Sequence, residues 1–206
     1  MSQISTILWD VGGVLLTNGW DHKERYAVLD HFGLDRAEFE KRHPEPNDIW
    51  EKGLITVEEY LERTVFYEPR SFTPQDFFEM MRAQSKLLPE TGLPVLKQVA
   101  ASGIYQMATV NNEARELNDY RIRNFGLSDY LDGFFSSCYV GMRKPDPRIH
   151  RLALDVLQRD PREVVFVDDR EGNAAAAESL GIRCIVFKNA GQLTREFSAL
   201  GIAAAA

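Results

Sequence analysis

Five short apolar runs divide the chain and predict the strands of a buried sheet. They are rich in β-branched and aromatic residues and mostly apolar on both faces. This pattern is typical of parallel strands that helices cover on each side. The predicted strands are Ser5–Trp9, Ile104–Thr109, Gly133–Cys138 (the weakest), Glu163–Val167 and Arg183–Phe187.

Segments with helical periodicity lie between these runs. Pro94 begins one of them at a position that a helix tolerates, and Gly126 ends another. Strands that alternate with helices predict an α/β fold with a Rossmann-like, doubly wound parallel sheet. The expected helices cover residues 94–102, 113–126, 145–158, 172–181 and 190–200.

The segment from Trp20 to Leu88 contains no convincing strand. Thr56 and Glu59 have the spacing of a capping box, and Thr73 precedes Pro74 as an N-cap. The pattern predicts a helical domain at residues 19–88, inserted into a core domain of residues 1–18 and 89–206. Its expected helices cover residues 22–33, 35–43, 55–67 and 72–88.

Net charge, the length of apolar stretches and cysteine spacing limit the classes of function that the chain can have. The 206 residues carry a net charge of −7 with no long basic run, which argues against nucleic-acid binding. No apolar stretch approaches the roughly 20 residues of a membrane span. Cys138 and Cys184 lack metal-binding spacing, so we expect reduced thiols and a cytoplasmic protein. The tail GIAAAA is expected to fray. The chain is expected to be a monomer or a homodimer.

Polar residues follow four of the predicted strands, where parallel sheets bind their ligands. Asp10 follows the first strand, Thr109 ends the second, Lys144 comes after the third, and Asp168 and Asp169 follow the fourth. Three carboxylates, a hydroxyl and an ammonium suit a phosphate ester bound with a divalent cation. A carboxylate can also attack phosphorus and form an aspartyl-phosphate.

Each of these residues also has a structural interpretation. Asp10 could close a turn, Thr109 could be an ordinary strand residue, and Lys144 could lie in a solvated loop. Asp168 and Asp169 could simply begin a helix. Their order along the chain, each after its own strand, favours a common site.

Four segments together resemble the motifs of the haloacid dehalogenase-like superfamily of hydrolases. They are ILWDVGGVLL, MATVNN, GMRKPDP and VVFVDDREGN. Two further stretches, KGLITVEEY and SSCYVGMRKPDPRIHRLALD, are similar to the N-terminal phosphatase domain of soluble epoxide hydrolases and to bacterial sugar-1-phosphate phosphatases. The resemblance implies a phosphatase with a type-one helical cap that acts on a small phosphorylated metabolite, possibly a sugar phosphate.

The resemblance also implies residue roles. Asp10 would be the nucleophile and Lys144 a catalytic partner, while Asn173 would support the loop at Asp168 and Asp169. Mg²⁺ would be held by Asp10, the main-chain carbonyl of Gly12 and Asp169, with Asp168 close by. The substrate phosphate would contact Thr109, the amide of Val110 and Lys144.

Gly12 departs from the family pattern, which has an acid/base aspartate there. General acid–base catalysis is typically worth about 10²–10⁴-fold, so we expect a slower phosphatase or one limited to better leaving groups, such as sugar 1-phosphates and acyl phosphates. Asn18, Asp21 and His22 are nearby in sequence as candidate replacements. Val110 is a second departure, because the family often has asparagine there.

Two other functions are compatible with these residues. A 2-haloacid dehalogenase also lacks the second aspartate, but it has an aromatic residue where Gly12 lies and needs no metal. A regulatory protein could bind phosphate without turning it over.

Several residues in and near the helical domain have more than one possible role. Six aromatic residues could line its pocket or form its core, and the core interpretation is favoured. Arg143 could bind an anion or lie in solvent. The four histidines have no ligand spacing. The six aromatic residues are Trp20, Trp50, Tyr60, Phe66, Tyr67 and Phe72.

Overall fold

A computed structural model describes residues 3–203; part of the alanine-rich tail that was expected to fray lies outside the described residues. Five parallel strands form one sheet in the order β3-β2-β1-β4-β5. This confirms the doubly wound α/β fold. The strands are β1 (Thr6–Trp9), β2 (Gln106–Asn111), β3 (Gly133–Ser136), β4 (Val164–Asp168) and β5 (Arg183–Val186).

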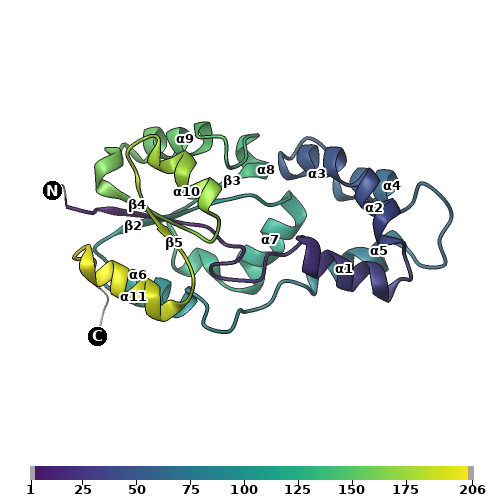
Figure 1. Cartoon of the computed structure of the whole chain (residues 1–206), viewed down its shortest axis with the longest axis horizontal. Coiled ribbons are helices and arrows are strands. Elements are labelled where there is room, and N and C mark those ends of the chain that lie inside the picture. Colours follow the sequence, from purple (N-terminus) through teal and green to yellow (C-terminus); the bar gives the residue numbers. More distant parts are fainter. Residues whose placement is uncertain (1–2, 204–206) are drawn as a thin grey trace.

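Alternating residues of the strands supply two separate cores, one on each face of the sheet. Ile7 and Trp9 pack with α6 (Leu93–Ala101) and α11 (Ala190–Ala199). Leu8 packs on the opposite face with α9 (Arg148–Leu157) and α10 (Glu171–Glu178). The two helical layers lie above and below the sheet in Figure 1. Burial on both faces explains why the strands are mostly apolar.

Shorter elements connect the layers. Helix α7 (Arg115–Asn124) follows β2, and the helical turn α8 (Ser137–Val140) follows β3. The 3-10 helices η1 (Leu127–Asp129) and η2 (Pro161–Glu163) precede β3 and β4. None of the helices in residues 3–203 is both long and apolar enough to cross a membrane.

Five helices form a second cluster beyond one end of the sheet, at the right of Figure 1. We call them the helical module: α1 (His22–His31), α2 (Arg36–Arg42), α3 (Pro44–Glu51), α4 (Val57–Thr64) and α5 (Pro74–Arg82). They enclose an apolar core of their own, which also includes Ala114 and Leu117 at the start of α7. The expected capping box at Thr56 and the N-cap at Thr73 are both present. The limits of the two proposed domains stay a prediction.

The structure corrects four predicted elements. Helix α3 was not predicted, although Pro44 occupies a first-turn position where its missing N–H costs nothing. The strand expected at Gly133–Cys138 ends at Ser136, and the next residues form α8. Strand β2 lies two residues later than expected, and α5 ends at Arg82 rather than residue 88.

His150 is a buried polar residue in α9. Neither ring nitrogen has a hydrogen-bond partner among the described residues, and the ring packs edge-on against Phe166. Burial, together with the nearby positive charge of Lys144, lowers the pKa of His150 to about 4. The neutral imidazole is therefore the form that the folded protein holds.

We predict that His150 makes the protein acid-sensitive. In the unfolded chain His150 is protonated below about pH 6.5, whereas in the folded protein it stays neutral down to about pH 4. The free energy of unfolding therefore decreases as pH falls through this window. His150→Leu is expected to flatten this loss by about 1.4 kcal/mol per pH unit. Urea unfolding at pH 7, 6 and 5 measures it. An unchanged slope in the variant would contradict the assignment.

Candidate active site

The carboxyl ends of the strands bring the predicted polar residues to one edge of the sheet. Trp9 pairs with Thr109 of β2 and with Val167 of β4. The residue after Trp9 is Asp10, so in this register it lies level with Asp168 at the end of β4. The loop after β3 and α8 brings Lys144 to the same place. The edge predicted from the strand order is the one that the structure builds.

Lys144 lies between two carboxylates. Its Nζ is 3.0 Å from Oδ1 of Asp10 and 2.6 Å from Oδ2 of Asp168. Its side chain is only 1% exposed, so the contacts form with little solvent screening. Burial favours the neutral amine, but the two carboxylates outweigh it and raise the pKa of Lys144. Lys144 is therefore a fixed cation.

The pKa values of the two carboxylates shift in opposite directions. Burial raises the pKa of Asp10 to about 7, and the charge of Asp168 adds to this while Lys144 opposes it. Asp168 is also buried, but Lys144 overcomes this and lowers its pKa. Asp168 further accepts hydrogen bonds from Asn173 Nδ2 at 3.0 Å and from the Arg170 amide at 2.8 Å. Both carboxylate oxygens of Asp168 thus accept hydrogen bonds, whereas Oδ2 of Asp10 has no hydrogen bond to a described residue.

Asn112 is a site residue that the sequence analysis did not single out. Its Nδ2 donates to the Lys144 carbonyl at 2.8 Å, and its Oδ1 accepts from the Lys144 amide, also at 2.8 Å. This pair of bonds fixes the Lys144 main chain against the end of β2. Its only sequence signal was its position after a strand.

Thr109 and Val110 lie at the correct end of β2, but both side chains are fully buried. Val110 packs in the apolar core beside Leu8, and the Thr109 hydroxyl has no hydrogen-bond partner among the described residues. Neither side chain lines the cavity described below, which Asn112 does. Their contact with a phosphate stays a prediction.

The acidic cluster fits a divalent cation. Asp10, Asp168 and Asp169 each offer a carboxylate oxygen, and these oxygens lie within 4.8 Å of one another. Oδ1 of Asp169 is buried with no hydrogen-bond partner in residues 3–203. Three carboxylates against one ammonium leave surplus negative charge, and hard cations prefer oxygen ligands. This donor set could hold Mg²⁺.

Gly13 lets Asp169 approach this cluster. It has a φ of +73°, and a Cβ built on it would lie 2.2 Å from Oδ2 of Asp169. A side chain at this position would therefore displace the carboxylate as well as strain the turn. The close contact with Asp169 thus explains why position 13 is a glycine.

A cavity of about 430 Å³ opens beside Asp10 and Lys144, between the sheet edge and the helical module. Most of its lining side chains are polar or charged, with Trp20, Pro44 and Pro145 as the larger apolar exceptions. A molecule bound there would meet hydrogen-bonding groups on most sides. From the module come Arg25, Glu40, His43, Asn47 and Glu51; from the core come Gly12, Asn112, Glu113, Arg121 and Arg143.

His43 presents a neutral ring to this cavity. Burial, with the charge of Arg25, lowers the pKa of His43 to about 3. Its Nδ1 lies 2.8 Å from the Tyr60 hydroxyl, which accepts a bond from Trp20 Nε1 at 2.7 Å. The Tyr60 proton is therefore free for Nδ1, which leaves an N–H at Nε2.

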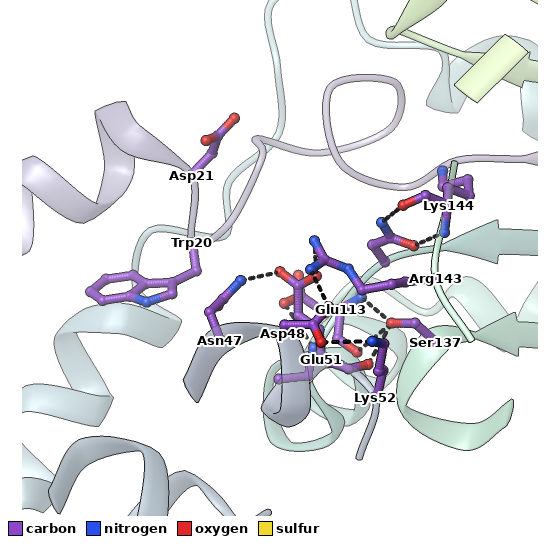
Figure 2. A network of polar contacts seen from close by, with 12 residues as sticks. Trp20, Asp21, Asn47, Asp48, Glu51, Lys52, Glu113, Ser137, Arg143 and Lys144 are labelled. Atoms are coloured by element: carbon purple, nitrogen blue, oxygen red, sulfur yellow. Dashed lines mark hydrogen bonds and ion pairs between the residues drawn. The ribbon is translucent and has the colours of Figure 1, made fainter. Parts of the chain in front are cut away.

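Arg143, which lines the cavity, binds residues of α3, and Figure 2 shows these contacts. It contacts Asp48 at 3.0 Å and Glu51 at 2.7 Å, and Ser137 Oγ donates to the Glu51 carbonyl at 2.6 Å. On the other side of the cavity, Arg170 pairs with Asp21 at 2.7 Å. Arg143 therefore joins the module to the core through ion pairs while its side chain stays 30% exposed. Its contact with an anion stays a prediction.

The aromatic residues mostly form the core of the module. Trp50 and Tyr60 are stacked with their centroids 4.3 Å apart, and both are fully buried. Phe66 and Phe72 pack against the same core, and Tyr67 stacks with Arg42. Of the six candidates, only Trp20 lines the cavity.

Comparison with known proteins identifies the family. The sequence profile of the haloacid dehalogenase-like hydrolases matches residues 4–181. The chain is 33% identical to flavin mononucleotide hydrolase 1 of Arabidopsis thaliana over 172 residues, which is 83% of this chain and 69% of the relative. Together with the parallel sheet and its edge of carboxylates, these matches show a hydrolase. The chain belongs to the haloacid dehalogenase-like hydrolase family.

Two further likenesses agree with this assignment. Bifunctional epoxide hydrolase 2 of Rattus norvegicus is 40% identical over 70 residues, a match that covers 34% of this chain and only 13% of that protein. The magnesium complex of the HAD family enzyme bt-2542 from Bacteroides thetaiotaomicron superposes with a TM-score of 0.81 over 95% of this chain and 99% of that one. At 23% identity the superposition shows the fold alone.

Proposed function

We propose that this protein is a Mg²⁺-dependent phosphatase that hydrolyses a small phosphorylated metabolite through an aspartyl-phosphate on Asp10. The observation that carries the proposal is the contact of Lys144 with both Asp10 and Asp168, beside a third carboxylate at Asp169. This arrangement supplies a nucleophile, a fixed cation and a set of cation ligands at one point. The similarity to a flavin mononucleotide hydrolase supports it, because flavin mononucleotide is itself a phosphate monoester.

In the proposed reaction each residue has a distinct task. Asp10 attacks phosphorus, and Lys144 holds a negative phosphoryl oxygen as a point charge. Asp168, fixed by Asn173 and the Arg170 amide, keeps Lys144 in place. Asp10, Asp169 and the Gly12 carbonyl would hold Mg²⁺ with Asp168 nearby; when bound, the ion neutralises phosphoryl charge.

The cavity lining supports a polar leaving group. Hydrogen-bonding side chains such as Asn47, His43 and Glu51 line a space of about 430 Å³. Hydroxyl groups can pair with such side chains, whereas an apolar group would leave them unpaired. We therefore place sugar phosphates first among the substrates.

The proposal is tested by phosphate release from a panel of sugar phosphates, acyl phosphates and flavin mononucleotide, with Mg²⁺ or with a chelator. Release that requires Mg²⁺ supports the proposal. No release from any compound, together with tight phosphate binding, would instead indicate a regulatory protein. Halide release from 2-chloropropionate that a chelator does not affect would indicate a dehalogenase.

Gly13→Ala is expected to weaken Mg²⁺ binding, because the new methyl group would displace Asp169. Loss of a group that orients a metal ligand typically costs about 10–100-fold in affinity. The Mg²⁺ concentration for half-maximal activity should rise by this factor. Gly172→Ala is the matched control: Gly172 lies in helix α10 with nothing within 4 Å of the added carbon. Equal Mg²⁺ requirements in the two variants would contradict the placement of Asp169.

A further inference from the structure

Asn18 and Arg121 bound the space beside Gly12 at the cavity wall. A Cβ built on Gly12 would lie 3.1 Å from Asn18 Oδ1, 3.4 Å from Asn18 Cα and 3.8 Å from Arg121 Nη1. A side chain at this position, including the acid/base aspartate that the sequence lacks, would extend toward these groups. Arg121 is the charged one of the two.

Arg121 is held in place by three partners. Its Nη1 is 2.9 Å from Oε2 of Glu113, its Nη2 donates to the Thr17 carbonyl at 2.7 Å, and its Nε donates to Ser85 Oγ at 3.1 Å. Its side chain is 2% exposed, so the guanidinium is fixed within the protein. The cation is therefore in position before any substrate binds.

The loop between β1 and α1 is shaped around this guanidinium. Gly19 has a φ of +70°, and a Cβ on it would come within 2.2 Å of Arg121 Nη2. The backbone therefore approaches the charge more closely than any other residue would allow. The contact brings the Gly12–Gly19 loop and α7 together at the cavity wall, where both Gly12 and Arg121 lie.

The other candidates for replacing the missing acid are less suited. The Asn18 amide does not ionise at ordinary pH. Asp21 caps α1 and pairs with Arg170, and His22 is an exposed residue that contacts Asp21. Glu113 also lines the cavity, but its Oε2 is paired with Arg121 Nη1 at 2.9 Å. Position 12 thus has no proton donor, and the guanidinium of Arg121 lies beside it.

We propose that Arg121 stabilises the leaving oxygen by charge, in place of the proton that an aspartate would donate; this rests on the proposed phosphatase function. Asp10 forms the new P–O bond while the bond from phosphorus to the leaving oxygen breaks, and the electron pair stays on that oxygen beside Arg121. Water then protonates the alkoxide, and the resulting hydroxide attacks the aspartyl-phosphate and releases Asp10 and hydrogen phosphate. Arg121 keeps its proton throughout, because its guanidinium does not deprotonate in proteins.

The test compares a sugar 6-phosphate, whose alkoxide leaves poorly, with p-nitrophenyl phosphate, whose phenolate needs no such help. Arg121→Met should lower kcat/KM for the sugar phosphate by about 10²-fold or more, the usual cost of losing one donor to a developing oxyanion. The p-nitrophenyl phosphate rate should change far less. Because the ratio of the two rates is taken on one preparation, any unfolded fraction cancels. Arg121→Lys, which keeps the charge, should recover part of the ratio.

Arg123→Met is the matched control, because Arg123 lies exposed on the same helix and should leave the ratio unchanged. Equal losses on both substrates in Arg121→Met would mean a structural role and would overturn the proposal. A Glu113→Gln variant that lowers the ratio more than Arg121→Met does would also overturn it, in favour of a proton donor at Glu113. If the parent hydrolyses neither substrate with Mg²⁺, the phosphatase function itself fails.

Discussion

Asp10→Asn is expected to abolish phosphate release, lowering kcat by at least about 10⁴-fold, because the amide cannot form the aspartyl-phosphate. The substitution keeps the shape of the side chain, and Lys144 keeps Asp168 as a partner. Since burial already raises the pKa of Asp10 to about 7, removing its charge should disturb the fold little. The measurement is single-turnover phosphate release with Mg²⁺.

Asp155→Asn provides the control, because Asp155 lies exposed on α9 and its carboxylate makes no hydrogen bond to a described residue. Its activity should equal that of the parent. Unfolding curves of both variants show whether any loss of activity comes from loss of structure. Equal rates for Asp10→Asn and the parent would rule out the proposed nucleophile.

Lys144→Met should damage both stability and activity. The variant leaves Asp10 and Asp168 buried together without their shared cation, and removing one partner of a buried ion pair typically costs about 3–5 kcal/mol. Activity should fall by about 10²–10³-fold through the lost charge on the phosphoryl group. We expect Mg²⁺ to restore part of the stability, because it would compensate the same carboxylates.

Urea unfolding with and without Mg²⁺ measures this effect, and Lys188→Met is the control. Lys188 is exposed after β5, so its loss should change neither stability nor the response to Mg²⁺. A Lys144→Met protein as stable as the parent would show that the ammonium does not hold the carboxylates together.

The closed position of the helical module has a physical basis in ion pairs across the cavity. Arg143 of the core binds Glu51 of the module, as Figure 2 shows. Arg170 of the core pairs with Asp21 at the start of α1. Arg143 is the residue before Lys144. The loop that brings Lys144 to the proposed phosphate site therefore also contacts the cavity wall around the proposed leaving group. A change in the position of either residue should therefore alter the position of the other.

The sheet and the edge that carries the candidate site could be predicted from the sequence, because both depend on local patterns. Apolar runs define strands, and parallel strands end at one edge, so Asp10 and Asp168, which follow two of these strands, are expected to meet there. Helix α3 was missed because its prolines obscure a short amphipathic pattern. The roles of the aromatic residues could not be decided either, since periodicity does not tell a core face from a cavity face.

What the sequence determined by itself was the order of the strands and of most helices, the carboxylates and the lysine that follow the strands, and the absence of an acid at position 12. Only the tertiary structure decided that Arg121, more than 100 residues away along the chain, lies beside Gly12, and that Asn112 fixes the Lys144 main chain. The reason is physical: strand and helix patterns arise from neighbours in the chain. The partners of a buried charge are chosen by how distant segments pack.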